Sequence, residues 1–217
     1  MMEVFATIIL GVAVVAGLSY FVILPGPPSH RRAVWKTLPV LLLAVYALIM
    51  EAPGLLVVAL ALSALGDAFL AYPGEKNFMG GLASFLLAHV AYAVLFLLVG
   101  DIGFLSDDAV RMAVTVVLVV LAAGLVVFLW RPAGRLAPAV LAYATVIVAM
   151  AVLSLSVPTV VVFAGAALFL SSDIVLAIQT FRMGESHPLR GLASIYVWAS
   201  YFAAQLVLTL SLVAIAS

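Results

Sequence analysis

The stretch Ser63-Ala-Leu-Gly-Asp-Ala-Phe-Leu-Ala71 places one carboxylate, Asp67, near the end of a long apolar run that begins at about Gly54. About 20 apolar residues are enough for a helix to cross the hydrocarbon core of a bilayer. An acid at the centre of such a helix costs about 2.5 to 3.5 kcal/mol. The stretch therefore predicts a membrane-spanning helix with a buried acid whose presence needs a physical reason.

The composition extends this interpretation to the whole chain. Of the 217 residues, 68% are hydrophobic and 8% are charged, whereas a soluble domain is about half apolar and about a quarter charged. So few charges cannot cover a soluble domain of this length, and we expect a multi-pass membrane protein. The chain has no cysteine, which excludes disulfides, thiolate nucleophiles and cysteine metal sites. Nothing in the sequence indicates a nucleic-acid partner, and nothing determines the oligomeric state.

Apolar runs of spanning length, separated by turn residues, predict how the chain crosses the membrane. We expect an all-α bundle of eight transmembrane helices that forms a single transmembrane domain over residues 1–217. The first apolar run lacks the basic N-terminal region of a signal peptide, so we expect it to remain in the protein as a membrane-spanning helix. The expected helices cover residues 3–24, 33–51, 54–72, 78–99, 109–130, 136–155, 157–181 and 191–216.

Basic residues are distributed unevenly between the loops on the two sides of this bundle. Cytoplasmic loops of membrane proteins carry an excess of Lys and Arg. We therefore expect both termini to be non-cytoplasmic, in a bacterial-type cell membrane. The loops on the terminal side hold only Arg111, beside Asp101, Asp107 and Asp108. The loops after the first, third, fifth and seventh helices, with the adjoining helix ends, hold Arg31, Arg32, Lys36, Lys76, Arg131, Arg135, Arg182 and Arg190.

Three short motifs recur in the same order in the two halves of the chain. We interpret them as a duplication into two parallel four-helix repeats, 1–99 and 109–217, related by an axis along the membrane normal. The matching pairs are Lys36-Thr-Leu-Pro39 with Arg135-Leu-Ala-Pro138, Asp67-Ala-Phe-Leu-Ala71 with Asp173-Ile-Val-Leu-Ala177, and Gly81-Leu-Ala-Ser84 with Gly191-Leu-Ala-Ser194.

The duplication predicts that four ionisable groups lie at one depth, in the cytoplasmic half of the bilayer: Asp67, Asp173, Lys36 and Arg135. Either the two aspartates are structural partners of the basic groups or of helix-end amides, or they line a polar cavity. Carboxylates inside membranes usually mark functional sites, which favours the polar cavity. We select Asp67 and Asp173 as the catalytic candidates. Lys36 either snorkels to the lipid headgroups or binds a phosphate.

Further polar residues are placed to serve such a cavity. His89 lies about 15 Å into its helix, near the midplane, and Tyr92 shares its helix face. Tyr201 and Gln205 are one turn apart and are placed to face a cavity. His89 is also explained by a hydrogen bond to a neighbouring carbonyl. The other histidines lie in loops, so the clustered histidines of a zinc hydrolase are missing, and we expect no metal and no cofactor.

Four groups of residues add a likeness to a known family: Gly66-Asp67-x-x-Leu70, Phe78-x-x-Gly81-Leu-Ala-Ser-Phe85-x-x-Ala-His89-x-x-Tyr92, Phe169-Leu-Ser-Ser172-Asp173-x-x-Leu176-Ala177 and Tyr201-Phe-Ala-Ala-Gln205-Leu. Together with the helix entrance at Lys36 and Pro39, they resemble the YhhN family, the family of the mammalian lysoplasmalogenases. The likeness extends from about Lys36 to Gln205.

The resemblance implies a hydrolase that cleaves the alkenyl ether bond of a lysophospholipid-type substrate among the membrane lipids. It makes Asp67 and Asp173 the catalytic residues, without deciding which of them is the acid. Two acids in different environments are able to divide the roles of proton donor and carboxylate. Lys36 and Arg135 are then placed to hold the phosphate, and His89 and Tyr92 to orient a carboxylate or the water.

Two other functions fit the same residues. Parallel repeats with paired intramembrane carboxylates also suit a transporter or lipid carrier, although transporters often break their midplane helices with Gly or Pro. The helices of Asp67 and Asp173 have no proline at mid-span. A structural membrane subunit is the third reading, and it predicts that both aspartates tolerate replacement by asparagine.

The charge distribution predicts the topology, which reporter fusions measure. Alkaline phosphatase, which is active only outside the cytoplasm, is expected to be active when fused after Ser217 and inactive when inserted in the loop 72–77. The reason is the excess of Lys and Arg in the loops on the 72–77 side. An inactive fusion at the C-terminus, together with an active one in the loop, would contradict this orientation.

Overall fold

The computed structural model describes residues 1–216, and its long elements are all helices. Eight long helices occur in this range, each ending within about three residues of its expected bounds, which confirms the all-α class. Ser217, the last residue of the expected domain, lies outside the described residues. The long helices are α1 (Met2–Ile23), α2 (His30–Ile49), α3 (Gly54–Leu70), α4 (Glu75–Val99), α6 (Ala109–Ala133), α7 (Ala137–Ser154), α8 (Val160–Phe181) and α9 (Arg190–Ala216).

The helices have the length and apolar character of membrane spans. Within residues 1–216, six segments are long and apolar enough to cross a bilayer, where α6 and α7 count together as the stretch Ala109–Ser154. The helix Gly54–Leu70 is apolar but shorter. In hydrocarbon a helix satisfies its backbone groups internally, which is why such apolar runs fold as helices. The chain is therefore a multi-pass membrane protein.

The chain is divided into two compact units. The first unit contains residues 1–95 and 205–216, and the second contains residues 96–204. Helices α4 and α9 each carry residues of both units. This division does not test the duplication into residues 1–99 and 109–217, which stays a prediction.

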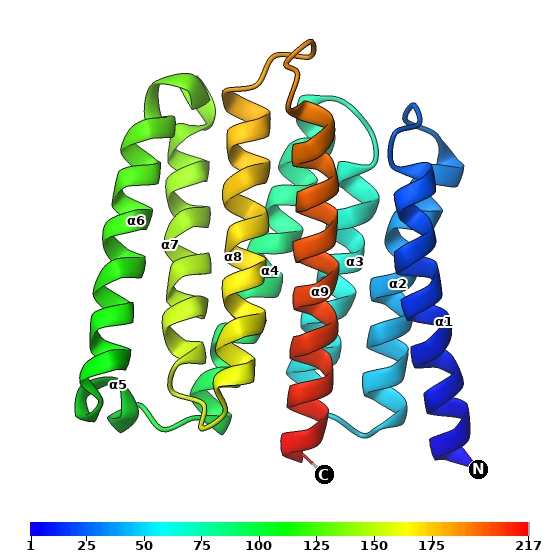
Figure 1. The fold of residues 1–217 in the computed structure, drawn as a ribbon, viewed down its shortest axis with the longest axis vertical. Helices are drawn as coiled ribbons and strands as arrows, with labels where there is room; N and C mark the ends of the chain where they lie inside the picture. The colour runs from blue at the N-terminus through cyan, green and yellow to red at the C-terminus, as the bar shows by residue number, and fades with distance from the viewer. Residues whose placement is uncertain (217) are drawn as a thin grey trace. The chain divides into compact units, whose positions relative to one another are not determined.

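In the first unit, α1 packs on α2 and α2 packs on α3, so the chain runs back and forth between neighbours (Figure 1). Tyr20, Leu43 and Leu60, one from each helix, are fully buried. A hydrogen bond of 2.7 Å joins the Nδ1 atom of His30 and the hydroxyl group of Tyr72. The beginning of α2 and the end of α3 therefore lie at the same end of this unit.

Helix α2 begins three residues before its expected start at residue 33. The reason is a cap: the Ser29 side chain accepts a hydrogen bond from the backbone N–H of Arg32, which satisfies one of the first amides of the helix. Lys36 accordingly lies in the second turn of α2, and Pro39 lies inside the helix. The expectation that Pro39 stands near the helix start is corrected, because the preceding cap extends the helix toward the N-terminus.

Small residues set the contact between α3 and α4. A Cβ atom on Gly66 would lie 2.6 Å from the ring of Phe85, and one on Gly81 would lie 2.6 Å from the side chain of Leu70. The pairing of residue 66 with 85 and of 70 with 81 shows that the helices are antiparallel. The same register brings Ser63 to the level of Ala88 and its neighbour His89.

In the second unit, α6, α7 and α8 are side by side (Figure 1). The expected loop before α6 contains a short helix, α5 (Gly103–Asp107), and the break after α6 contains a 3-10 turn, η1 (Gly134–Leu136). The Asp101 side chain starts α5 by accepting a 2.8 Å hydrogen bond from the backbone N–H of Gly103.

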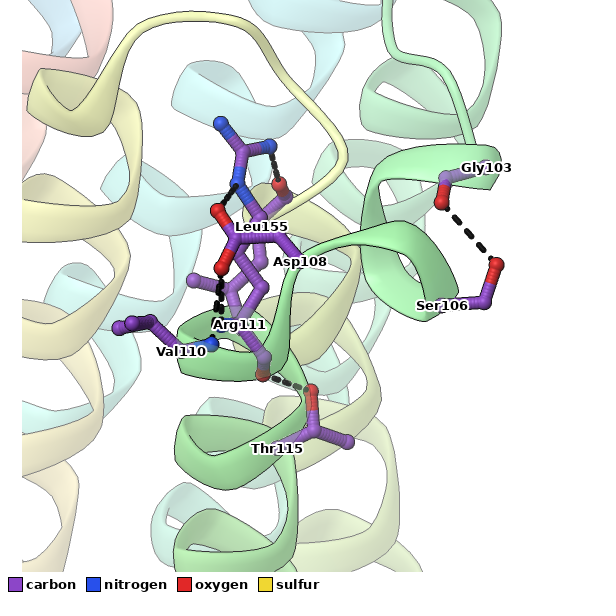
Figure 2. Close-up of polar contacts among 7 residues, drawn as sticks. All are labelled: Gly103, Ser106, Asp108, Val110, Arg111, Thr115 and Leu155. Atoms are coloured by element: carbon purple, nitrogen blue, oxygen red, sulfur yellow. Dashed lines mark hydrogen bonds and ion pairs between the residues drawn. The ribbon is translucent and has the colours of Figure 1, made fainter.

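Arg111 connects the beginning of α6 to the end of α7 (Figure 2). The Asp108 carboxylate caps α6 by accepting from the backbone N–H groups of Val110 and Arg111, at 2.8 and 3.3 Å. The Arg111 side chain forms an ion pair with Asp108 at 3.6 Å and donates to the carbonyl oxygen of Leu155. The one basic residue expected on the terminal side thus has a structural explanation.

Helix α6 continues beyond its expected end at residue 130, through Pro132. Proline has no N–H to give to the carbonyl group four residues earlier, which is that of Phe128. Arg182, the residue that follows α8, donates from Nη2 to this carbonyl oxygen at 2.7 Å. An arginine from a distant part of the sequence thus replaces the missing backbone donor.

The contact of Gly66 with Phe85 predicts a cost for any side chain at this position. Gly66→Ala is expected to lower the free energy of unfolding by about 1 to 2 kcal/mol, because overpacking costs more than alanine gains in helix propensity. The matched control is Gly11→Ala, where a Cβ atom meets nothing within 4 Å. Thermal unfolding in detergent measures both variants, and equal midpoints would contradict the proposed close contact.

Candidate active site

Asp67 and Lys36 form an ion pair inside the first unit. The Lys36 Nζ atom lies 3.2 Å from Oδ1 of Asp67, where the aspartate side chain is 1% exposed and the lysine side chain is 18% exposed. The pair forms because α2 and α3 are antiparallel, so an early residue of α2 meets a late residue of α3. A buried carboxylate is tolerated when it is paired. Asp67 is therefore held in place by a cation from a neighbouring helix.

Several polar groups lie near this pair in sequence and register. Ser63, one turn before Asp67 on α3, is fully buried, and its hydroxyl group has no hydrogen-bond partner within residues 1–216. The buried Thr37 hydroxyl, next to Lys36 on α2, also has no partner in that range. The register of α3 and α4 puts Ser63 at the level of His89, which is completely buried. These side chains supply hydrogen-bonding groups within an otherwise apolar bundle.

Tyr92 and Gln205 form a second polar contact in the first unit. The Tyr92 hydroxyl donates to Oε1 of Gln205 at 2.7 Å, and both side chains are completely buried. The amide Nε2 of Gln205 has no hydrogen-bond partner within residues 1–216. Because a buried donor without a partner is costly, this amide is a natural contact for an oxygen atom of a ligand.

Asp173 is held by a tyrosine in the second unit. The Tyr143 hydroxyl on α7 donates to Oδ2 of Asp173 on α8 at 2.5 Å. The preceding residue, Ser172, donates to the carbonyl oxygen of Val197 at 3.2 Å, which ties α8 to α9. Asp67 thus contacts an ammonium group, and Asp173 contacts a phenol.

Tyr143 is the residue that the sequence reasoning missed as a member of the site. It lies 30 residues before Asp173, and no motif connects the two. Ser63 had a usable signal, because four residues separate it from Asp67 and place both on one helix face.

The other expected binding residues are divided between the two units. Arg135 is exposed in the turn η1 of the second unit. Tyr201 is buried in the second unit, where its ring contacts Phe169 edge-on at a centroid distance of 5.3 Å and Trp198 at 5.8 Å. Lys36, His89, Tyr92 and Gln205 belong to the first unit. The roles of all these residues remain predictions.

The side chains that commonly bind metals are dispersed. Among residues 1–216, no group of three or more His, Asp or Glu side chains is arranged to hold a metal ion. The chain contains three histidines. His89 is buried within α4 and His187 lies in the turn region before α9, whereas His30, expected in a loop, is the exposed first residue of α2 because the Ser29 cap extends that helix.

The sequence profile of the YhhN family matches residues 31–212, which include every candidate residue described above. The chain belongs to the YhhN family. This confirms the resemblance seen in the sequence motifs.

Relatives of this YhhN protein carry one enzyme name. The chain is 34% identical over 163 residues to proteins called lysoplasmalogenase in Mycobacterium bovis and Mycobacterium tuberculosis. The aligned residues cover 71% of this chain and 58% of each mycobacterial protein. The chain is 35% identical over 189 residues to lysoplasmalogenase TMEM86B of Homo sapiens, covering 84% of this chain and 76% of the human protein. The chain thus spans less than two thirds of the mycobacterial relatives. No solved structure matches it significantly.

The ion pair between Lys36 and Asp67 predicts a non-additive effect on stability. Lys36→Met is expected to destabilise the protein by about 1 to 3 kcal/mol, because it leaves a buried carboxylate without its cation; the cost is below that of a fully buried pair because Lys36 is partly exposed. Adding Asp67→Asn to Lys36→Met is expected to recover most of this loss. Unfolding experiments in detergent measure the free energy of unfolding of the wild type, the Lys36→Met variant and the double variant.

The matched control is Lys76→Met, which removes an exposed lysine from the first turn of α4. A Lys36→Met variant as stable as Lys76→Met would show that the pair contributes nothing to stability.

Proposed function

We propose that this protein is a lysoplasmalogenase-like hydrolase that cleaves the alkenyl ether bond of a lysoplasmalogen by aspartate acid–base chemistry, without a metal ion. The names of its relatives support the class of enzyme. The observation that carries the chemistry is the environment of Asp67, a carboxylate 1% exposed with an ammonium group 3.2 Å away. Ionisable groups are expensive inside a membrane, and they mark functional sites there by default.

Cleavage of an alkenyl ether needs a proton and a water molecule. A proton adds to the vinyl carbon that does not carry the oxygen, and the C=C electron pair forms the new C–H bond. The carbon bonded to oxygen becomes part of an oxocarbenium ion, which water captures to give a hemiacetal with loss of a proton. The hemiacetal then breaks its C–O bond to glycerol, and its hydroxyl proton is transferred to the departing glycerol oxygen, so the products are a fatty aldehyde and a glycerophospho-base. One acid and one carboxylate are sufficient for these steps.

The partners of the two aspartates suggest how the roles divide. Asp67 lies 3.2 Å from the Lys36 ammonium group, and it is assigned the role of the carboxylate that stabilises the oxocarbenium ion or activates water. Asp173, whose Oδ2 atom lies 2.5 Å from the Tyr143 hydroxyl group, is assigned the other role, that of proton donor. The deprotonated donor takes up the proton released when water adds, which regenerates the acid.

The remaining polar groups are assigned to the substrate. Lys36 is partly exposed and Arg135 is exposed, so each is able to meet a phosphate group in the headgroup layer. The Nε2 donor of Gln205 and the hydroxyl of Ser63 are buried without partners in the described residues, and they suit a glycerol oxygen or the attacking water. His89 and Tyr92 keep their expected role of orienting these groups.

The proposal predicts the loss of turnover in two asparagine variants. Asp67→Asn and Asp173→Asn are each expected to lower the release of aldehyde from lysoplasmalogen by at least about 100-fold, the scale of general acid–base catalysis. Folded yield in detergent is the parallel measurement. The matched control is Asp107→Asn, which changes an exposed carboxylate on the terminal side and is expected to keep wild-type turnover.

Chelation tests the metal-free part of the proposal. Wild-type turnover is expected to be unchanged by EDTA. Loss of activity on chelation would contradict the metal-free chemistry, and wild-type turnover in both asparagine variants would contradict the role of the aspartates. A protein that moves or binds lysolipid but releases no aldehyde from it would instead favour the carrier function.

A further inference from the structure

A groove outside the candidate active site lies at the C-terminal end of α6, within the second unit. Its volume is about 380 Å³. Its walls combine apolar side chains, two aromatic rings and two guanidinium groups. The lining residues are Val126, Val127, Phe128, Trp130, Arg131 and Arg182.

The two arginines give the groove an uncompensated positive charge. Arg182 is occupied by neutral groups, since it donates to the Phe128 carbonyl oxygen at 2.7 Å and lies 4.0 Å above the centroid of the Phe128 ring. Arg131 is exposed, and its side chain makes no hydrogen bond or ion pair within residues 1–216. Neither arginine is paired with a carboxylate in that range, so both charges are available to an anion.

The position of the groove along α6 corresponds to the lipid headgroups. Arg131 follows Ala109 by about 22 residues, or about 33 Å of helix, which is close to the thickness of the hydrocarbon core. Trp130 is half exposed, as is typical of aromatic side chains at the membrane interface. Val127, one turn deeper than Arg131, is 77% exposed and offers an apolar wall to an acyl chain.

We propose that this groove binds one anionic phospholipid. The phosphate and the anionic headgroup contact Arg131 and Arg182, and an acyl chain lies along Val126 and Val127. A phospholipid fits better than a soluble anion because the arginines continue directly into an apolar surface at hydrocarbon depth. The proposal is independent of the hydrolase activity, since the groove contains none of the residues assigned to it.

Quenching by brominated lipids tests the proposal on the full-length protein in vesicles. The fluorescence of Trp130 is obtained as the difference between the wild type and Trp130→Phe. Brominated phosphatidylglycerol is expected to quench this signal with a relative association constant at least about fivefold above that of brominated phosphatidylcholine. One basic side chain near an anionic lipid contributes about 1 kcal/mol, which corresponds to this factor.

Variants separate the two arginines from general surface charge. Arg131→Gln is expected to reduce the preference for phosphatidylglycerol by about fivefold. Arg182→Lys is expected to keep it, because lysine retains the charge and a donor for the Phe128 carbonyl group. The matched control, Lys76→Gln, removes one charge elsewhere on the chain and is expected to leave the preference unchanged.

Several results would overturn the proposal. Equal quenching by the two brominated lipids would show that the groove does not select an anionic headgroup. Equal losses in Arg131→Gln and Lys76→Gln would assign the preference to net charge alone. Relief of quenching by millimolar inorganic phosphate would identify a site for a free anion. Absence of quenching by either lipid, in a preparation shown to be dimeric, would place a second copy of the chain on the groove.

Discussion

A charge inside hydrocarbon needs a partner from the protein, and the pair of Lys36 with Asp67 meets this requirement. Both groups lie within a bundle whose other buried side chains are largely apolar, and water is not available there to solvate an isolated carboxylate. The pair restricts how α2 and α3 are able to pack, since only an antiparallel arrangement in this register brings the two groups to 3.2 Å. The geometry of the candidate site in the first unit depends on this contact.

The same requirement explains the irregular positions of the second unit. Pro132 leaves the Phe128 carbonyl group without a backbone donor, and Arg182 supplies one. Asp173 takes its hydrogen bond from Tyr143. In each case a group that the bilayer cannot satisfy is satisfied by a side chain from another helix. Asp67 contacts an ammonium group and Asp173 contacts a phenol, and the proposed division of roles between the two acids starts from these contacts.

Apolar length and turn chemistry were sufficient to predict the eight long helices and the all-α membrane class. Their bounds were less accurate where a local cap or a side chain from elsewhere decides the end of a helix. Ser29 moves the start of α2, and Arg182 allows α6 to continue through Pro132. Asp67, His89 and Gln205 were recognisable as candidates because polar side chains are rare in runs of this composition, whereas Tyr143 has no sequence feature that marks it as a partner of Asp173.

The sequence by itself determined which segments enter the membrane, which acids lie within them, and the family to which the chain belongs. These properties follow from the composition of single segments, because each residue contributes its own free energy of transfer into hydrocarbon. Only the tertiary structure decided that Lys36 is the partner of Asp67, that Tyr143 is the partner of Asp173, and that Tyr92 meets Gln205. These contacts join residues on different helices, and they depend on helix rotation and register, which side-chain packing sets and no single segment encodes.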